Sequence, residues 1–212
     1  RGVGRPASSD RGVPGHYLNY NGALRLRPAP SLVNAMIEEL QDYYDRHGIS
    51  AMGFSCRRYL DCRAGSAEMV PAKEAYISPG YLAHELPRVL FLSHAPGDDS
   101  RTDDPAGRTM AGAAAGEARD DVLSLPKHRH WYRTHEQAWI LLGAFRLGLR
   151  IEEAKGYFAH TNSCKCRFDS DSHVGPDLRF RNCRPYIPGE IELLEPDILV
   201  TQGNAAREVV EG

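Results

Sequence analysis

Three of the five cysteines in the chain lie within one stretch of 27 residues, from 160 to 186. Cys164 and Cys166 flank a single lysine, and Cys183 follows after sixteen intervening residues. Thiolates in such groups are typical ligands of zinc ions and of iron–sulfur clusters. The wide loop between Cys166 and Cys183 favours a cluster, because a cluster is larger than a zinc ion, and zinc is the alternative.

The other two cysteines, Cys56 and Cys62, have five residues between them, which is looser than the C-x2-C pair typical of zinc sites. The first residues contain arginines but no apolar stretch typical of a secretory signal, so we expect a cytoplasmic protein. In that compartment clustered cysteines favour metal binding or catalysis over disulfides. A further interpretation stays open, in which the cysteines are small buried apolar side chains.

The elements that must position these residues alternate between helices and short apolar strands. Apolar residues recur at helical spacing between Ser31 and Gly48, which predicts a helix that Ser31 caps and Gly48 ends. The remaining predicted elements are a strand over 89–92, a loop leading into a helix within 106–125, a helix over 135–149, a strand over 157–162, a helix over 189–196, a strand over 197–203 and a helix from 204.

This alternation predicts an α/β fold, with three layers in the order α/β/α and a short central parallel sheet. In such sheets functional groups gather at the carboxyl ends of the strands. Those ends read SHAPGDD, HTNSCKC and TQGNAA in this chain, and each is rich in polar residues or glycine. We therefore expect the functional site at this edge of the sheet.

Length and composition agree with one domain without a membrane span. The 212 residues are 42% hydrophobic and 25% charged, with a net charge of -2, so general binding of nucleic acid through overall positive charge is not expected. No apolar run reaches the roughly 18 residues of a membrane-spanning helix. Residues 1–30, rich in Gly, Pro and Arg, are predicted to form a flexible arm, and residues 31–212 a single domain that is a monomer.

Three stretches carry a resemblance to a known family. They read FLSHAPGDDSRTDDPAGRTMAG from residue 91, HTNSCKCRF from residue 160, and NCRPYIPGEIELLEPDILVTQGNAA from residue 182. Together they resemble the uracil-DNA glycosylase superfamily, and most closely its iron–sulfur branch, family 4. That branch has a G-E-A-P-G loop, a G-R-P-F-V-G segment, and a T-N-x-V-K-C-R-P motif followed by a later cysteine. The resemblance covers residues 88–206 and implies a uracil-DNA glycosylase-like fold.

The resemblance also implies a 4Fe–4S cluster that has a structural role. Position by position, its ligands would be Cys56, Cys62, Cys166 and Cys183. The first two are more widely spaced here than in the family. Cys164 stands where the family has an apolar residue, and is expected to be a spare thiol.

Asn162 matches the asparagine that recognises uracil in the family. An amide offers both a donor and an acceptor to a flipped base, although an asparagine at a strand end is also a common turn residue. The stacking phenylalanine of the family is Met110 here, and Ala95 and Gly97 complete the expected base site.

The chain departs from the family in the residues that act on water. The acid of the G-E-A-P-G loop is His94 here, and Asp98 follows the loop directly. We assign catalysis to Asp98 and His94, because a carboxylate near the sugar can activate water and stabilise a cationic transition state. A turn-capping or solvated role for Asp98 is the alternative.

The H-P-S motif that ends the family's domain does not occur, and we expect either a divergent protein or a fragment. Three histidines of the segment KHRHWYRTHEQ could replace the missing histidine, but a solvated helix start is the favoured interpretation for them. They are His128, His130 and His135.

Arginines near the cysteines are expected to contact DNA phosphates without reading sequence. The predicted phosphate ligands are Arg167, Arg181 and Arg184. A wider basic patch would add Arg57, Arg58, Arg63, Lys165 and Arg179.

The predicted activity is hydrolysis of the N-glycosidic bond of uracil, or of another deaminated base, in DNA. The first alternative is a catalytically inactive iron–sulfur module of the same fold that binds DNA or senses damage. The second is a zinc- or cluster-bearing α/β domain with no role on DNA.

Overall fold

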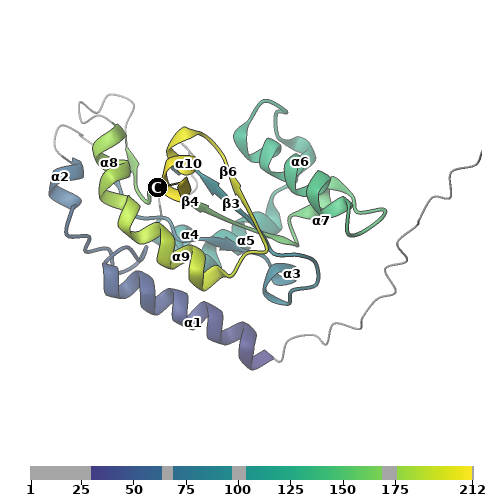
Figure 1. Cartoon of the computed structure of the whole chain (residues 1–212), viewed down its shortest axis with the longest axis horizontal. Coiled ribbons are helices and arrows are strands. Elements are labelled where there is room, and N and C mark those ends of the chain that lie inside the picture. Colours follow the sequence, from purple (N-terminus) through teal and green to yellow (C-terminus); the bar gives the residue numbers. More distant parts are fainter. Residues whose placement is uncertain (1–29, 64–68, 97–103, 169–175, 212) are drawn as a thin grey trace, which may run out of the picture.

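The computed structural model describes residues 30–63, 69–96, 104–168 and 176–211 (Figure 1). The predicted arm therefore lies outside the described residues, apart from Pro30, which begins the first helix. Among the described residues, no helix combines the length and the hydropathy that a membrane span requires.

A four-stranded sheet forms the centre of the molecule, with strand order β2-β4-β3-β6. Its strands are β2 (Tyr76–Ile77), β3 (Val89–Ser93), β4 (Phe158–Asn162) and β6 (Ile198–Thr201). The three strands predicted from sequence are parallel to one another, whereas β2 pairs antiparallel with β4. The sheet is thus mixed rather than wholly parallel. Sequence analysis missed β2 because a two-residue strand is too short to give a pattern.

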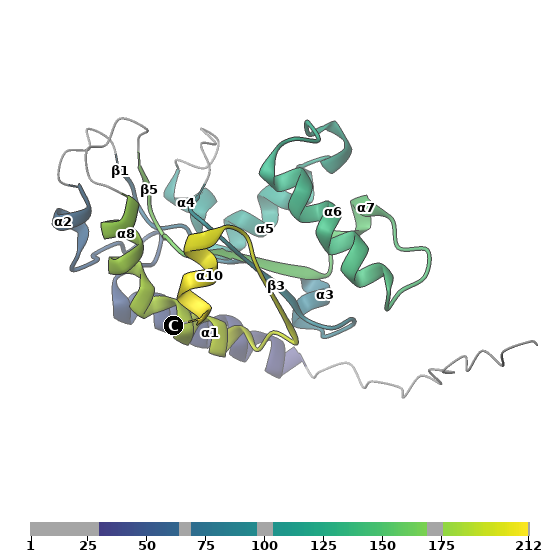
Figure 2. The same ribbon diagram turned by 45° about the horizontal axis from the view of Figure 1, so that its top comes forward.

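Helices cover both faces of the sheet, which confirms the three-layer α/β/α prediction (Figures 1 and 2). One face carries α1 (Pro30–His47), α9 (Ile187–Leu194) and α10 (Asn204–Glu211). The other carries α5 (Met110–Arg119), α6 (His130–Gly143) and α7 (Ile151–Ala154). Period-two alternation along β3 and β4 supplies apolar side chains to both layers.

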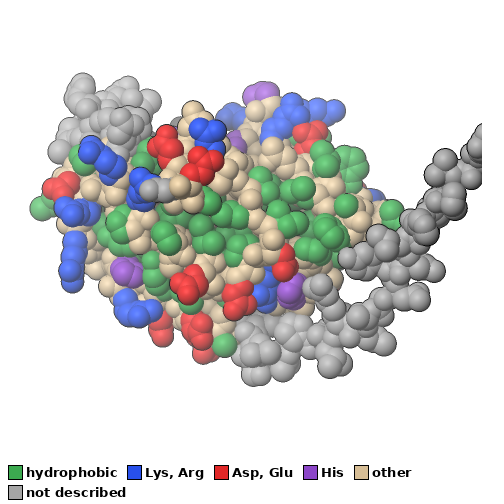
Figure 3. All heavy atoms as spheres, in the orientation of Figure 1, with side chains coloured by type: hydrophobic (Ala, Val, Ile, Leu, Met, Phe, Trp, Pro, Cys, Tyr) green, Lys and Arg blue, Asp and Glu red, His purple; other side chains and the backbone are tan. Residues whose placement is uncertain are grey.

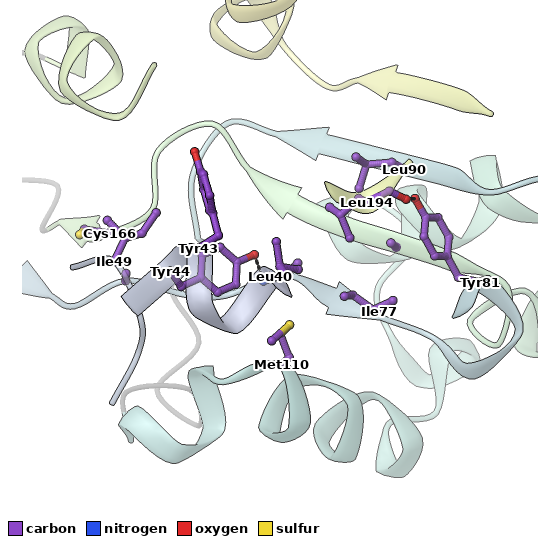
Figure 4. Close-up of a cluster of buried hydrophobic side chains, with 13 residues drawn as sticks. Leu40, Tyr43, Tyr44, Ile49, Ile77, Tyr81, Leu90, Met110, Cys166 and Leu194 are labelled. Atoms are coloured by element: carbon purple, nitrogen blue, oxygen red, sulfur yellow. Dashed lines mark hydrogen bonds between the residues drawn. The ribbon is translucent and has the colours of Figure 1, made fainter. Parts of the chain in front are cut away.

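On the first face, α1 packs its apolar stripe into the larger core cluster. Leu40 and Tyr44 are fully buried, and Leu90 of β3 and Leu194 of α9 meet them there (Figure 4). Gly48 ends the helix with φ +64°, a left-handed conformation that glycine adopts without strain, as predicted.

On the second face, Phe91 and Phe158 form an edge-to-face pair with ring centroids 5.4 Å apart, against Ala138 and Leu142 of α6. His135 of the same helix is fully buried, so its predicted place on a solvated helix start is wrong. Its Nε2 lies 2.7 Å from Glu117 Oε1, and its Nδ1 lies 2.8 Å from the carbonyl oxygen of Trp131. The side chain of Glu117 and the backbone of α6 therefore hold the ring of His135 from both of its nitrogens.

The remaining elements are short and connect or cover the sheet. A separate two-stranded sheet pairs β1 (Met69–Val70) with β5 (Arg167–Phe168). The short helices are α2 (Tyr59–Arg63), α3 (Pro79–Leu82), α4 (Pro105–Arg108), α8 (Pro176–Cys183), and the 3-10 turns η2 (Val122–Ser124) and η3 (Arg184–Tyr186).

Candidate functional site

The carboxyl ends of β3, β4 and β6 meet at one edge of the sheet, as predicted. The amide of Ser163 donates to the carbonyl of Ser93 at 2.8 Å, and the amide of Cys164 donates to the carbonyl of His94 at 2.9 Å. On the other side of β3, the amide of Gln202 donates to the carbonyl of Leu92 at 2.8 Å. These bonds tie the loops after β4 and β6 to the end of β3 and to the first residue after it.

Ser93, the last residue of β3, is the centre of a polar network at this edge. Its Oγ lies 2.6 Å from Gln202 Oε1, 2.9 Å from His130 Nε2 and 2.7 Å from His160 Nε2. A hydroxyl has one hydrogen and accepts two hydrogen bonds. The amide oxygen of Gln202 only accepts, so Ser93 donates to it, and both histidines donate their Nε2–H to Ser93.

Both histidines of the network have lowered pKa values, so both rings are neutral at pH 7. Burial lowers the pKa of His130, and burial together with nearby positive charges holds the pKa of His160 well below its usual range. Neutral rings with hydrogen on Nε2 present the Nδ1 lone pair as an acceptor. Sequence analysis missed the network, because its members come from β3, α6, β4 and the residue after β6.

Asn162, the predicted base reader, is the last residue of β4 and the register partner of Ser93. Paired residues of neighbouring strands point to the same face, so its side chain lies on the α6 side of the sheet. It is buried, and no hydrogen bond from the described part of the chain engages its amide. The amide therefore lies at the strand ends, and its role as base reader stays a prediction.

The other predicted base contacts are spread over different surroundings. Met110 begins α5, is 7% exposed, and packs in the same core cluster as Leu40 and Tyr44 (Figure 4). Ala95 is half-buried in the loop after β3. Gly97 and Asp98 lie outside the described residues. The base contacts of Met110, Ala95 and Gly97, and the catalytic role of Asp98, stay predictions.

His94 lies beside a cavity of about 460 Å³ at the same edge. Its ring packs against Phe180 of α8, with centroids 4.2 Å apart, and burial lowers its pKa. Arg181 and Arg184, both predicted phosphate ligands, line this cavity with it. The structure thus brings His94 together with two predicted phosphate ligands that are distant from it in sequence.

The four predicted cluster ligands lie within electrostatic reach of one another. Burial raises the pKa of Cys166 well above its usual range, and the charges of Cys183, Cys56 and Cys62 raise it further. Burial raises the pKa of Cys62 as well, while a hydrogen bond from Asn182 lowers it. Three of these thiols are buried and Cys56 is half-buried.

Contacts between elements hold this cysteine group (Cys56, Cys62, Cys166 and Cys183) in place. Asn182 of α8 donates to Cys62 Sγ at 3.3 Å, which joins α8 to α2. Cys56 Sγ lies 3.8 Å from the hydroxyl of Tyr186. In the described residues, no three His, Cys, Asp or Glu side chains are grouped so as to hold a metal ion. The cluster and the zinc alternative both stay predictions.

Cys164, expected to be a spare thiol, belongs to the same neighbourhood. It is 2% exposed, and its hydrogen bond to Cys183 lowers the pKa of Cys183 to about 7. The amide of Lys165 also donates to Cys183 Sγ, at 3.5 Å.

Lys165 does not belong to the predicted basic patch. Its side chain is 1% exposed, and its ammonium group forms an ion pair with Glu190 of α9 and donates to Thr161 Oγ1 at 2.7 Å. Glu190 also accepts from the hydroxyl of Tyr44 of α1. This buried pair fixes the cysteine-bearing loop to two helices.

The basic patch is otherwise a partial match to the prediction. Arg179 is buried, so its predicted place in the exposed basic patch is wrong, as it is for Lys165. Arg181 and Arg184 are exposed, and Arg167 is half-buried. Arg57, Arg58 and Arg63 are exposed too. Figure 3 shows Lys and Arg side chains at the end of the molecule where Figure 1 places α2 and α8.

Comparison with known proteins bears on this arrangement. No curated protein matches the chain. The family model described as the uracil DNA glycosylase superfamily matches residues 79–212. This range includes the strands β3, β4 and β6, and β2 lies just before it. The match covers more than half of the chain, and the convergent strand ends described above fall within it. The chain belongs to the uracil DNA glycosylase superfamily.

Proposed function

We propose that this protein is a DNA glycosylase that removes uracil, or another deaminated base, from DNA. Membership of the superfamily supports glycosylase chemistry on DNA in general. The observation that carries the finer proposal is the position of Asn162, whose amide lies at the shared edge of three strands beside Ser93. An amide there can donate to one edge atom of a flipped pyrimidine and accept from another.

The reaction is hydrolysis of the bond between C1′ of the sugar and the base nitrogen. Water attacks C1′, the glycosidic bond breaks, and the base leaves with the bonding electron pair and takes up a proton. The exposed ring of His94 has a lowered pKa and is neutral at pH 7, so one ring nitrogen can accept the proton from water. Asp98 is proposed to stabilise the positive charge that develops on the sugar.

We further propose that Cys56, Cys62, Cys166 and Cys183 hold a 4Fe–4S cluster. Support comes from the chemistry of the donors, because four thiols from separate elements converge and influence one another electrostatically. When bound, the cluster would cross-link the loops that carry its ligands, and it takes no part in the hydrolysis. Zinc is the alternative occupant of the same thiols.

The test of the activity uses a single-stranded oligonucleotide with one uracil, followed by alkaline cleavage at abasic sites. The wild-type protein should produce scission, and Asn162→Ala should lower the rate about 100-fold or more. Asn34→Ala, which alters an exposed residue of α1, is the matched control and should keep the wild-type rate. Equal rates of scission in all three proteins would show that Asn162 takes no part in the reaction.

One observation favours the non-catalytic alternative. The loop after β3 presents a histidine where the related motif presents an acid, and that histidine packs against Phe180. A wild-type protein that binds the oligonucleotide in a salt-sensitive way, without scission at uracil, hypoxanthine or xanthine, would establish the binding module instead.

The test of the cofactor is reconstitution under anaerobic conditions with iron and sulfide. We expect the broad visible absorption of an iron–sulfur cluster, its loss in Cys166→Ser, and its retention in Cys164→Ser. A colourless protein that contains stoichiometric zinc would contradict the cluster proposal and establish zinc as the occupant of these thiols.

A further inference from the structure

The cavity beside His94 has walls of two different kinds. It is formed by the loop after β3, by α8 and η3, and by α10, and its volume is about 460 Å³. That volume lies within the roughly 300–1,000 Å³ range of small-molecule pockets. Its lining includes His94, Phe180, Arg181, Arg184 and Glu208.

One wall is cationic. Arg181 and Arg184 are three positions apart across the junction of α8 and η3, so both side chains reach the same side of that segment. Arg184 Nη2 donates to the backbone carbonyl of Glu208 at 2.9 Å, which orients the guanidinium at the cavity. Guanidinium groups in such pairs bind phosphate through several parallel hydrogen bonds.

A second wall is aromatic and apolar. The rings of Phe180 and His94 lie 4.2 Å apart at an angle of 55°, and Ala205 and Val209 of α10 add aliphatic surface. Because burial lowers the pKa of His94, this wall offers a ring surface without a full charge at pH 7. Such surfaces stack on nucleic-acid bases.

We propose that this cavity binds one nucleotide of single-stranded DNA, next to the nucleotide whose base is excised. Arg181 and Arg184 bind its phosphate and Phe180 stacks on its base. The carboxylate of Glu208 on α10 repels the phosphate from that side, so the phosphate lies toward α8. This inference rests on the proposed function, since it assumes a DNA strand at the strand ends.

The neighbouring nucleotide, and not the excised one, fits the geometry. Asn162 lies on the α6 side of the sheet, whereas Leu92, one residue earlier in β3 than Ser93, points to the face that carries α10. The cavity lies beside α10 and is lined by His94. The carbonyl of His94 accepts from the amide of Cys164, two residues after Asn162, so the cavity and the strand end of Asn162 are neighbours. A strand that crosses this edge would therefore place adjacent nucleotides in the two regions.

The first test measures binding to a fluorescent single-stranded oligonucleotide without any deaminated base, as a function of salt. Arg181→Ala and Arg184→Ala should each lower affinity and reduce the salt slope by about 0.7, the value for one phosphate contact on single strands. Arg119→Ala removes an exposed arginine from α5 on the opposite face and should leave the slope unchanged. Unchanged slopes in both cavity variants would overturn the proposal.

The second test concerns the stacked base. Phe180→Leu keeps an apolar side chain against His94 but removes the ring, and should lower affinity about 5- to 100-fold. An oligonucleotide made only of abasic residues should show no difference between Phe180→Leu and the wild type. Equal weakening on both oligonucleotides would mean that Phe180 acts through packing alone, which contradicts the proposal.

The two proposals fail in different ways. A wild-type protein that neither binds nor cleaves uracil-containing DNA, single- or double-stranded, refutes the glycosylase and this cavity together. If the wild type excises uracil while the Arg181, Arg184 and Phe180 variants bind like Arg119→Ala, the cavity proposal alone is refuted.

Discussion

Ser93 shows how one side chain organises a site at the scale of single residues. Its hydroxyl uses its full capacity, with one donated and two accepted hydrogen bonds. This arrangement orients His130 and His160 and fixes the hydrogen of each ring on Nε2. Asn162 sits beside it in register, so the network supports the strand end that carries the proposed base reader.

We predict that Ser93→Ala destabilises the protein by about 2–4 kcal/mol, because it leaves two imidazole donors and one amide acceptor without their partner. The free energy of unfolding in urea measures this effect. Ser124→Ala is the matched control, since it removes an exposed hydroxyl that bonds the carbonyl of Asp121, and should change stability by less than about 0.5 kcal/mol. Similar values for the two variants would contradict the central role of Ser93.

At the scale of elements, α8 is the link between the cysteine group and the nucleotide cavity. Its residues Phe180 and Arg181 line the cavity, whereas Asn182 and Cys183 face the other cysteines. Loss of the cysteine contacts should therefore disturb the cavity, even though no cysteine lines it. The loop that carries Cys166 is secured separately, by the ion pair of Lys165 with Glu190.

We predict that Lys165→Met lowers the free energy of unfolding by about 3–5 kcal/mol, because Glu190 is left charged and buried. Adding Glu190→Gln should recover part of the loss, since a neutral amide still accepts from Tyr44 and Thr161. The exposed pair of Arg133 and Glu136 provides the comparison, and Arg133→Met should cost less than about 1 kcal/mol. A double variant as unstable as the sum of the single variants would show that the two residues do not interact.

At the scale of the whole molecule, the two histidines of the Ser93 network couple stability to pH. His160 faces Ser93, His130 and the ring of Trp131, and the positive charges of Lys73, Lys165 and His135 lie near it. Its pKa in the folded protein is well below the ordinary value, and that of His130 is lowered too. Below about pH 6.5 the unfolded chain therefore binds more protons than the folded protein.

We predict that the stability from these histidines is complete above about pH 6.5 and decreases as the pH falls further. Each histidine contributes a slope of up to about 1.4 kcal/mol per pH unit. Urea unfolding between pH 7.5 and 5.5 measures it, and His160→Gln should make the dependence shallower. His128→Gln, at an exposed position, should keep the wild-type slope. An unchanged slope in His160→Gln would contradict the prediction.

The sequence alone determined the elements whose signals are local. The amphipathic stripe predicted α1, and Gly48 ends it because a left-handed residue is needed there. Runs of apolar residues predicted β3, β4 and β6 close to their observed bounds, and the parallel order of these strands placed their polar ends together. The strand pattern also put Asn162 at the carboxyl end of β4, but only the resemblance to the glycosylase family singled it out as a base reader.

Only the tertiary structure decided which polar side chains are buried and what they face. Lys165 and His135 have the sequence context of solvated residues, yet both are buried because Glu190 and Glu117 come from distant elements to pair with them. The cavity likewise joins His94 to arginines and to α10, which lie far apart along the chain. Burying a charge is favourable only when a partner is in place, and partners brought together by folding leave no periodic pattern in the sequence.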